Sequence, residues 1–130
     1  MIKKLIPAAV IAIIGIAGLV IILRKPATKA PASSARTDII IHMTDQGFSP
    51  EKATIKQGQT IGFVNDGKDD HWPASNIHPT HEIYPQFDPK RPIAPNKSWN
   101  FTFDRVGTWY FHDHLFPSYG GSITVESPSS

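Results

Sequence analysis

The chain has 130 residues, a formal net charge of +2, six histidines and no cysteine. This length allows one domain and an appendage. The lack of cysteine excludes disulfides, a thiolate nucleophile and lipid attachment through sulfur. The basic residues are scattered rather than clustered, so no nucleic-acid interface is indicated.

The first element along the chain is an apolar segment. The 19 residues from Leu5 to Leu23 carry no charge. As a helix they would span about 28 Å, close to the ~30 Å hydrocarbon core of a bilayer. We therefore interpret residues 1–24 as an N-terminal transmembrane helix that anchors the chain. The alternative is a cleaved signal peptide with a small-x-small site at 30–32, although its apolar region exceeds the usual ~7–15 residues.

Residues 25–37 (KPATKAPASSART) form the next segment, which is rich in proline, alanine and serine. This composition cannot bury enough apolar surface to pack, so we expect an extended tether. Basic residues flank both ends of the apolar segment and leave its orientation open. We expect a short cytoplasmic N-terminus, with the folded domain on the extracytoplasmic side, periplasmic or extracellular.

Residues 38–126 predict an all-β domain, followed by a disordered tail at 127–130. Strand-prone runs occupy 38–43, 53–55, 60–64, 98–107, 108–114 and 121–126. In the fourth run Trp99, Phe101 and Phe103 alternate with polar residues, which is typical of a strand with one buried face. Several short strands separated by turn signals indicate a small β-sandwich.

Residues 66–96 interrupt this pattern. These 31 residues include six prolines and show neither strand nor helix periodicity. A connection of this length is uncommon inside a compact domain and is often functional. It carries three of the six histidines, His71, His78 and His81.

His112 and His114 stand two positions apart in a predicted strand. Residues at i and i+2 of a strand share a face, so the two imidazoles project together and can converge on one metal ion. Further nitrogen ligands must come from elsewhere, and the long segment supplies histidines. The predicted metal ligands are His71, His78, His81, His112 and His114.

Imidazole ligands suit copper, zinc, nickel and iron, and the Irving–Williams order places Cu(II) highest. We therefore predict copper, with zinc as the alternative. A proton-transfer site is another role for clustered histidines, but neither a nucleophile nor paired carboxylates accompany them. His42 lies outside both stretches and is expected to be an ordinary surface residue.

Two stretches together resemble the cupredoxins, a family of small Greek-key β-sandwiches that includes plastocyanin and amicyanin. They are GFSPEKATIKQGQTIGFVNDGKDDHWPAS (47–75) and FDRVGTWYFHDHLFPSYGGSITV (103–125). The resemblance spans residues 38–126. It implies an all-β, Greek-key cupredoxin-like sandwich, which in this chain follows the predicted transmembrane helix.

The resemblance also implies a blue-copper ligand set of His, Cys, His and Met. His71 matches the first ligand, but the alignment places Asp113, Phe116 and Tyr119 in the other three positions. Without a thiolate, no site of the blue type can form. Asp113 could then be a weak oxygen ligand, an acceptor for a histidine N–H or a solvated residue at the strand end, and we favour the last two.

GTWYFHDH (107–114) also resembles the H-x-H strand of multicopper oxidases. This resemblance implies that His112 and His114 can face copper. Another histidine of that family falls on Pro73, and the chain has only one domain. A complete trinuclear copper cluster is therefore not expected.

Taken together, the sequence predicts a membrane-tethered domain that holds one copper ion through histidines, for copper capture or delivery or for electron transfer. Its expected partners are the membrane, through the N-terminal helix, and a copper donor or acceptor or a redox protein. We favour a non-enzymatic role. Two alternatives stay open: a small copper-dependent oxidase with a substrate pocket, and a metal-free interaction module with Trp72, Tyr84 and Phe87 as contact residues.

Overall fold

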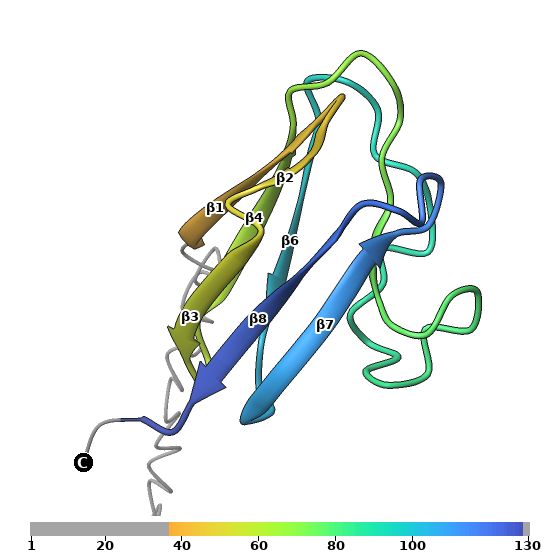
Figure 1. Cartoon of the computed structure of the whole chain (residues 1–130). Coiled ribbons are helices and arrows are strands. Elements are labelled where there is room, and N and C mark those ends of the chain that lie inside the picture. Colours follow the sequence, from red (N-terminus) through yellow and green to blue (C-terminus); the bar gives the residue numbers. More distant parts are fainter. Residues whose placement is uncertain (1–36, 129–130) are drawn as a thin grey trace, which may run out of the picture. The chain divides into compact units, whose positions relative to one another are not determined.

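The computed structural model describes residues 37–128, which form eight strands and no helix (Figure 1). The strands are β1 (Thr37–Thr44), β2 (Gly47–Ser49), β3 (Lys52–Lys56), β4 (Thr60–Asn65), β5 (Pro73–Ser75), β6 (Ser98–Thr102), β7 (Gly107–Asp113) and β8 (Gly120–Glu126). The predicted anchor, almost all of the predicted tether and the last two residues lie outside this range. No helix in the described part of the chain is long and apolar enough to cross a membrane.

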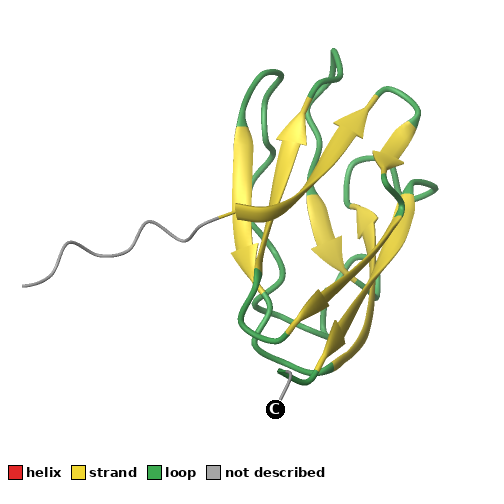
Figure 2. Cartoon of the chain, turned by 90° about the vertical axis from the view of Figure 1, so that its left-hand side faces the viewer, coloured by secondary structure: helices red, strands yellow, loops and turns green. Residues whose placement is uncertain are grey.

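The strands form two four-stranded sheets, ordered β2-β1-β4-β6 and β3-β8-β7-β5 (Figure 2). Each sheet contains one parallel pair, β1 with β4 and β3 with β8, and its other pairs are antiparallel. The inner faces pack against each other, and the predicted all-β sandwich is confirmed.

The core between the sheets follows the period of two that the sequence predicts for strands. Ile41 and Phe63 in one sheet and Phe111 and Ile123 in the other are almost completely buried. The rings of Phe63 and Phe111 meet edge to face, with centroids 5.8 Å apart. Burial of such large apolar side chains, each worth roughly 1.5–3 kcal/mol, holds the two sheets together.

Two short strands, β2 and β5, escape prediction. Each has three residues, too few to show a period of two, and β5 begins with Pro73. A proline cannot donate to a strand ladder, so it argues against a central strand but is tolerated at a sheet edge. β5 occupies such an edge, where it pairs with β7.

The long segment 66–96 is fixed to the sandwich rather than loose. In Figure 1 it runs, green to teal, from β4 past the upper end of β7 to β6. Tyr84 and Phe87 are buried in the hydrophobic core, so they are not available as contact residues of an interaction module. The Tyr84 hydroxyl donates a hydrogen bond to Asp104. Burial and this carboxylate raise the pKa of Tyr84 to about 12.

Candidate metal centre

The end of β7 presents different chemistry on its two faces. Phe111 and Asp113 are buried toward the sandwich interior, whereas Tyr110 on the opposite face is largely exposed. His112 and His114 share the face of Tyr110 by strand alternation. The predicted separation of the two histidines from Asp113 therefore follows from the regular geometry of the strand.

Four imidazoles gather on the outer face of β7. His78 and His81 come from the long segment, His112 and His114 from the strand end, and one nitrogen of each lies within 4.8 Å of the others. His78 Nδ1 is 3.2 Å from His112 Nε2, and His81 Nε2 is 3.0 Å from His114 Nδ1. Two nitrogens held at about 2.0–2.1 Å from one tetrahedral ion lie about 3.3–3.4 Å apart. These two nitrogen pairs therefore lie close to the spacing of ligands around one metal ion.

Two neighbouring side chains set the orientation of two of these rings. His81 Nδ1 donates to Asp88 Oδ2 at 2.6 Å, and His112 Nδ1 donates to Asn76 Oδ1 at 2.9 Å. Each acceptor is an oxygen with no proton to give, so each ring turns the lone pair of Nε2 toward the cluster. Hydrogen bonds of this kind orient metal-binding histidines and raise their basicity.

Asp88 is a buried carboxylate that contacts the four-histidine cluster directly, through His81. Burial alone would raise its pKa, but hydrogen bonds from His81, the Lys90 backbone and the Trp72 indole outweigh burial and hold the pKa of Asp88 below its usual range. Asp88 therefore carries a negative charge next to the cluster. That charge would partly balance a bound cation.

The two cluster imidazoles at the end of β7, His112 and His114, are disposed to stay neutral. Burial, together with repulsion from His81, His78 and His114, lowers the pKa of His112 to about 4. Burial, then His81 and His78, also lower the pKa of His114. Metal ions bind the neutral form of imidazole, so these rings need lose few protons near pH 7 to accept an ion.

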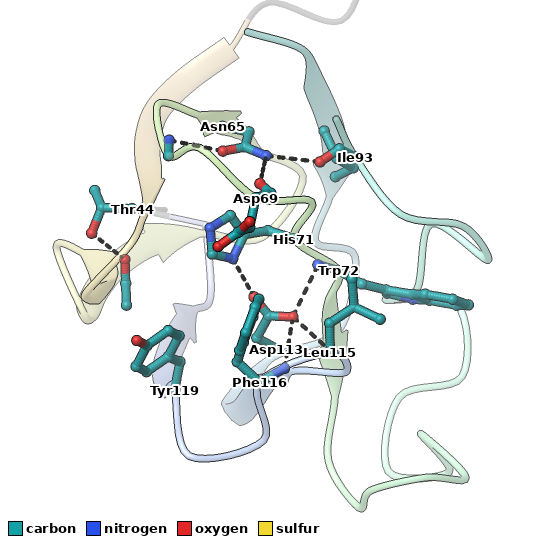
Figure 3. Close-up of polar contacts among 12 residues, drawn as sticks. Thr44, Asn65, Asp69, His71, Trp72, Ile93, Asp113, Leu115, Phe116 and Tyr119 are labelled. Carbon is teal, nitrogen blue, oxygen red and sulfur yellow. Dashed lines mark hydrogen bonds and ion pairs between the residues drawn. The ribbon is translucent and has the colours of Figure 1, made fainter. Parts of the chain in front are cut away.

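The structure does not bring His71 into the cluster. His71 is 2% exposed, and its Nδ1 donates to Asp113 Oδ2 at 2.5 Å on the inner side of β7 (Figure 3). Its Nε2 is buried, has no hydrogen-bond partner within residues 37–128 and faces Gly67, where an added Cβ would come within 2.9 Å. His71 precedes β5 and His78 follows it, so proximity in sequence does not place them on the same side of the sheet.

Asp113 is fully buried, so the interpretation as a solvated residue is wrong. Besides His71, its carboxylate accepts hydrogen bonds from the backbone N–H groups of Trp72 at 3.1 Å, Leu115 at 2.9 Å and Phe116 at 3.4 Å (Figure 3). The alternative of an acceptor for a histidine N–H is the one that the structure supports, with His71 as the donor. Through these hydrogen bonds, Asp113 links the residues just before β5 to the turn after β7.

The blue-copper ligand set does not fit the residues around His71 and Asp113 on the inner side of β7. Asp113 is engaged by four donors, and the Phe116 ring lies 5.6 Å from the His71 ring. Tyr119 donates its hydroxyl to the Asp45 carbonyl at 2.9 Å. The chain has no cysteine, and Tyr119 stands where the resemblance implies a methionine. The four-histidine cluster, in contrast, offers a complete set of nitrogen donors.

Sequence reasoning misses the side chains that hold the cluster in place. Nothing in the pattern singles out Asn76, and the spacing of Asp88 indicates nothing specific, although both lie in the long segment. Trp72 contributes as well, because its ring lies 4.6 Å from that of His114. The available signal is the polar and aromatic content of that segment, which does not reveal which residue meets which imidazole.

Comparisons with known proteins agree with this fold. A family model described as a cupredoxin-like domain matches residues 12–125. No curated protein matches the chain.

Three solved structures share the fold. A purple cupredoxin from Nitrosopumilus maritimus is 21% identical, with a TM-score of 0.60 over 68% of this chain and 100% of that one. An alanine-for-methionine variant of amicyanin with Cu(I) is 16% identical, with a TM-score of 0.57 over 68% and 81%. A reduced tyrosine-for-tryptophan variant of amicyanin is 16% identical, with a TM-score of 0.59 over 75% and 88%. Because the family model matches most of its length, the chain belongs to the cupredoxin-like domain family.

Proposed function

We propose that this chain is a membrane-tethered protein whose extracytoplasmic cupredoxin-like domain, of Greek-key topology, captures one copper ion and delivers it to a partner. The ion would be held by the four-histidine cluster of His78, His81, His112 and His114. The observation that carries this proposal is the convergence of four imidazole nitrogens within 4.8 Å of one another.

Copper is the ion that the donor set favours. Four nitrogen ligands without sulfur bind Cu(II) most strongly among the divalent first-row metals. Zinc accepts the same ligands and is the main competitor. The related amicyanin variant holds Cu(I), which supports copper as the metal of this fold. The buried carboxylate of Asp88 supplies charge balance for a cation at this position.

A role in carrying copper suits the ligands better than electron transfer. Blue-copper electron carriers depend on a cysteine thiolate, and this chain has none. An all-imidazole site would reorganise more between Cu(II) and Cu(I). Copper is therefore the cargo of the domain rather than a redox centre, and a copper donor or acceptor is the expected partner.

The membrane tether rests on the uncharged segment from Leu5 to Leu23, whose length matches the bilayer core. The tether at 25–37 would let the domain move close to the membrane surface. Such an arrangement would keep the copper site near membrane-bound partners that supply or receive the ion.

Metal titration of the full chain in detergent tests the proposal. We expect one equivalent of Cu(II), nitrogen couplings in the EPR spectrum, and displacement of zinc by copper in competition. A His112→Ala/His114→Ala double variant should lose this binding, whereas His42→Ala, outside the cluster, should retain it. Normal copper binding by the double variant, or none by the parent chain, would refute the proposal. Dioxygen consumption with a reductant would instead favour the oxidase alternative.

A further inference from the structure

We infer that copper enters and leaves the four-histidine cluster at His78, and that a partner's imidazole group replaces His78 by entering the hollow beside it. This inference rests on the proposed function, because it concerns exchange of the same ion. It assigns His78 the role of leaving ligand and the other three histidines the role of retaining the ion.

Three of the four imidazoles are held by groups outside the cluster. His81 is 3% exposed and His112 is 5% exposed, and each has its Nδ1 hydrogen-bonded to a side-chain oxygen. The His114 ring packs on Trp72, and its backbone N–H donates to the Trp72 carbonyl at 2.8 Å. Turning any of these rings away would break a hydrogen bond or an aromatic contact.

His78 lacks such support. It is exposed, and within residues 37–128 its ring hydrogen-bonds only to an imidazole, that of His112. Its ring otherwise lies 4.8 Å from the ring of His114. Breaking a buried hydrogen bond to a fixed partner costs stability, and the bond that His78 would break is only partly buried and joins it to a fellow ligand. Its displacement is therefore the least costly of the four.

The backbone on either side of His78 is anchored, so the side chain can swing without unfolding the segment. The His81 N–H donates to the Ile77 carbonyl at 2.7 Å, and the Ile83 N–H donates to the Asn76 carbonyl at 2.9 Å. These two bonds close a tight turn around His78. The other three histidines can stay in place while the His78 side chain rotates.

A hollow of about 290 Å³ lies beside His78. Its wall includes residues of the long segment, the end of β7 and the turn before β8: Asn76, Ile77, His78, His112, Pro117 and Ser118. His78 and His112 both line it, so a group seated there lies next to two of the four ligands. The hollow has room for a ring the size of imidazole.

The exchange step conserves charge and oxidation state. The lone pair of the entering imidazole nitrogen binds the ion as the lone pair of His78 Nδ1 leaves it. His81, His112 and His114 keep the ion bound during this replacement. The rate of transfer should therefore depend on the concentration of the entering donor and on the space in the hollow.

Stopped-flow transfer of Cu(II) from the loaded full chain to EDTA, with imidazole as the entering donor, tests the inference. In the parent chain the rate should rise with imidazole concentration. Ser118→Trp places a bulky ring at an exposed position on the wall, so it should slow the imidazole-dependent transfer several-fold while leaving copper stoichiometry unchanged. Thr108→Trp, at the exposed start of β7, is the matched control and should behave as the parent.

His78→Ala should still bind one equivalent of copper but release it several-fold faster than the parent. His81→Ala should instead weaken binding itself, since it removes a retained ligand. Equal imidazole-dependent rates for Ser118→Trp and the parent, or unchanged release from His78→Ala, would overturn the inference while copper binding, and with it the proposed function, stands. Failure of the parent chain to bind copper would remove both.

Discussion

Replacing Asp88 by asparagine tests how the cluster is organised, because this change keeps the size of the side chain and alters its hydrogen bonding. Asp88 Oδ1 accepts from the Trp72 indole at 2.8 Å and from the Lys90 backbone at 2.8 Å. Oδ2 accepts from His81 Nδ1 at 2.6 Å and from the Lys90 ammonium at 3.0 Å. An asparagine offers one oxygen where four donors now share two.

The amide has two orientations, and both disturb the site. With its oxygen toward Trp72, its NH₂ faces His81 Nδ1, which must then accept, so the proton of His81 moves to Nε2 and blocks the nitrogen that faces the cluster. With its oxygen toward His81, its NH₂ meets two N–H donors. We expect the first orientation, a loss of about 10–100-fold in copper affinity, and a loss of about 1–3 kcal/mol in the free energy of unfolding.

Two measurements check this prediction: copper affinity by competition with a chelator of known strength, and the thermal unfolding of the metal-free chain. Asp104→Asn is the control, because Asp104 accepts a hydrogen bond from Tyr84 and, within residues 37–128, none from a cluster histidine. It should lower the thermal stability without changing the copper affinity. Parent-like copper affinity and parent-like EPR nitrogen couplings in Asp88→Asn would refute the reasoning.

Three further predictions follow from the structure. Asp113→Asn should lower Tm by about 4–8 °C for each 1 kcal/mol lost, because the buried carboxylate accepts four hydrogen bonds. Its copper affinity should stay at the parent value, and a collapse of affinity in folded protein would contradict the two-face description of β7. The metal-free chain should lose stability as the pH falls from 6.5 toward 4. The reason is that His112 takes up a proton in the unfolded chain, whereas in the folded chain its pKa is lowered to about 4 and it stays neutral. Thermal unfolding should show Tm falling across this pH range, and His112→Gln should make that fall smaller. At a free copper concentration of 100 times Kd, binding adds about 2.7 kcal/mol to the free energy of unfolding. Removing the copper with EDTA should therefore lower Tm by about 10–20 °C. Equal melting curves with and without copper would mean that copper does not bind the folded form preferentially.

Periodicity and turn signals suffice to predict most of the sandwich. The alternation of Trp99, Phe101 and Phe103 and the β-branched runs reflect burial of one face, which acts locally and is visible in sequence. β2 and β5 depend on pairing with distant strands rather than on their own composition. Their three residues carry too little pattern to be recognised.

The candidate site, like the fold, can be predicted only in part from the sequence. The shared face of His112 and His114 follows from strand geometry alone. The separation of His71 from His78 depends on the path of the chain through β5, which has no sequence signature. The roles of Asn76 and Asp88 depend on how the long segment folds back over β7, and that arrangement is set by tertiary packing around Tyr84 and Phe87.

Odd and even positions at the end of β7 face separate compartments, and this has a consequence for how the protein can change. Position 113 belongs to the buried hydrogen-bond network inside the sandwich, while positions 112 and 114 belong to the four-histidine cluster on the outer face. Substitutions that adapt the cluster to another cation need not disturb the hydrogen bonds of Asp113. Substitutions that strengthen those hydrogen bonds need not alter which cation the cluster binds. Stability and cargo preference are thereby free to evolve independently within three consecutive residues.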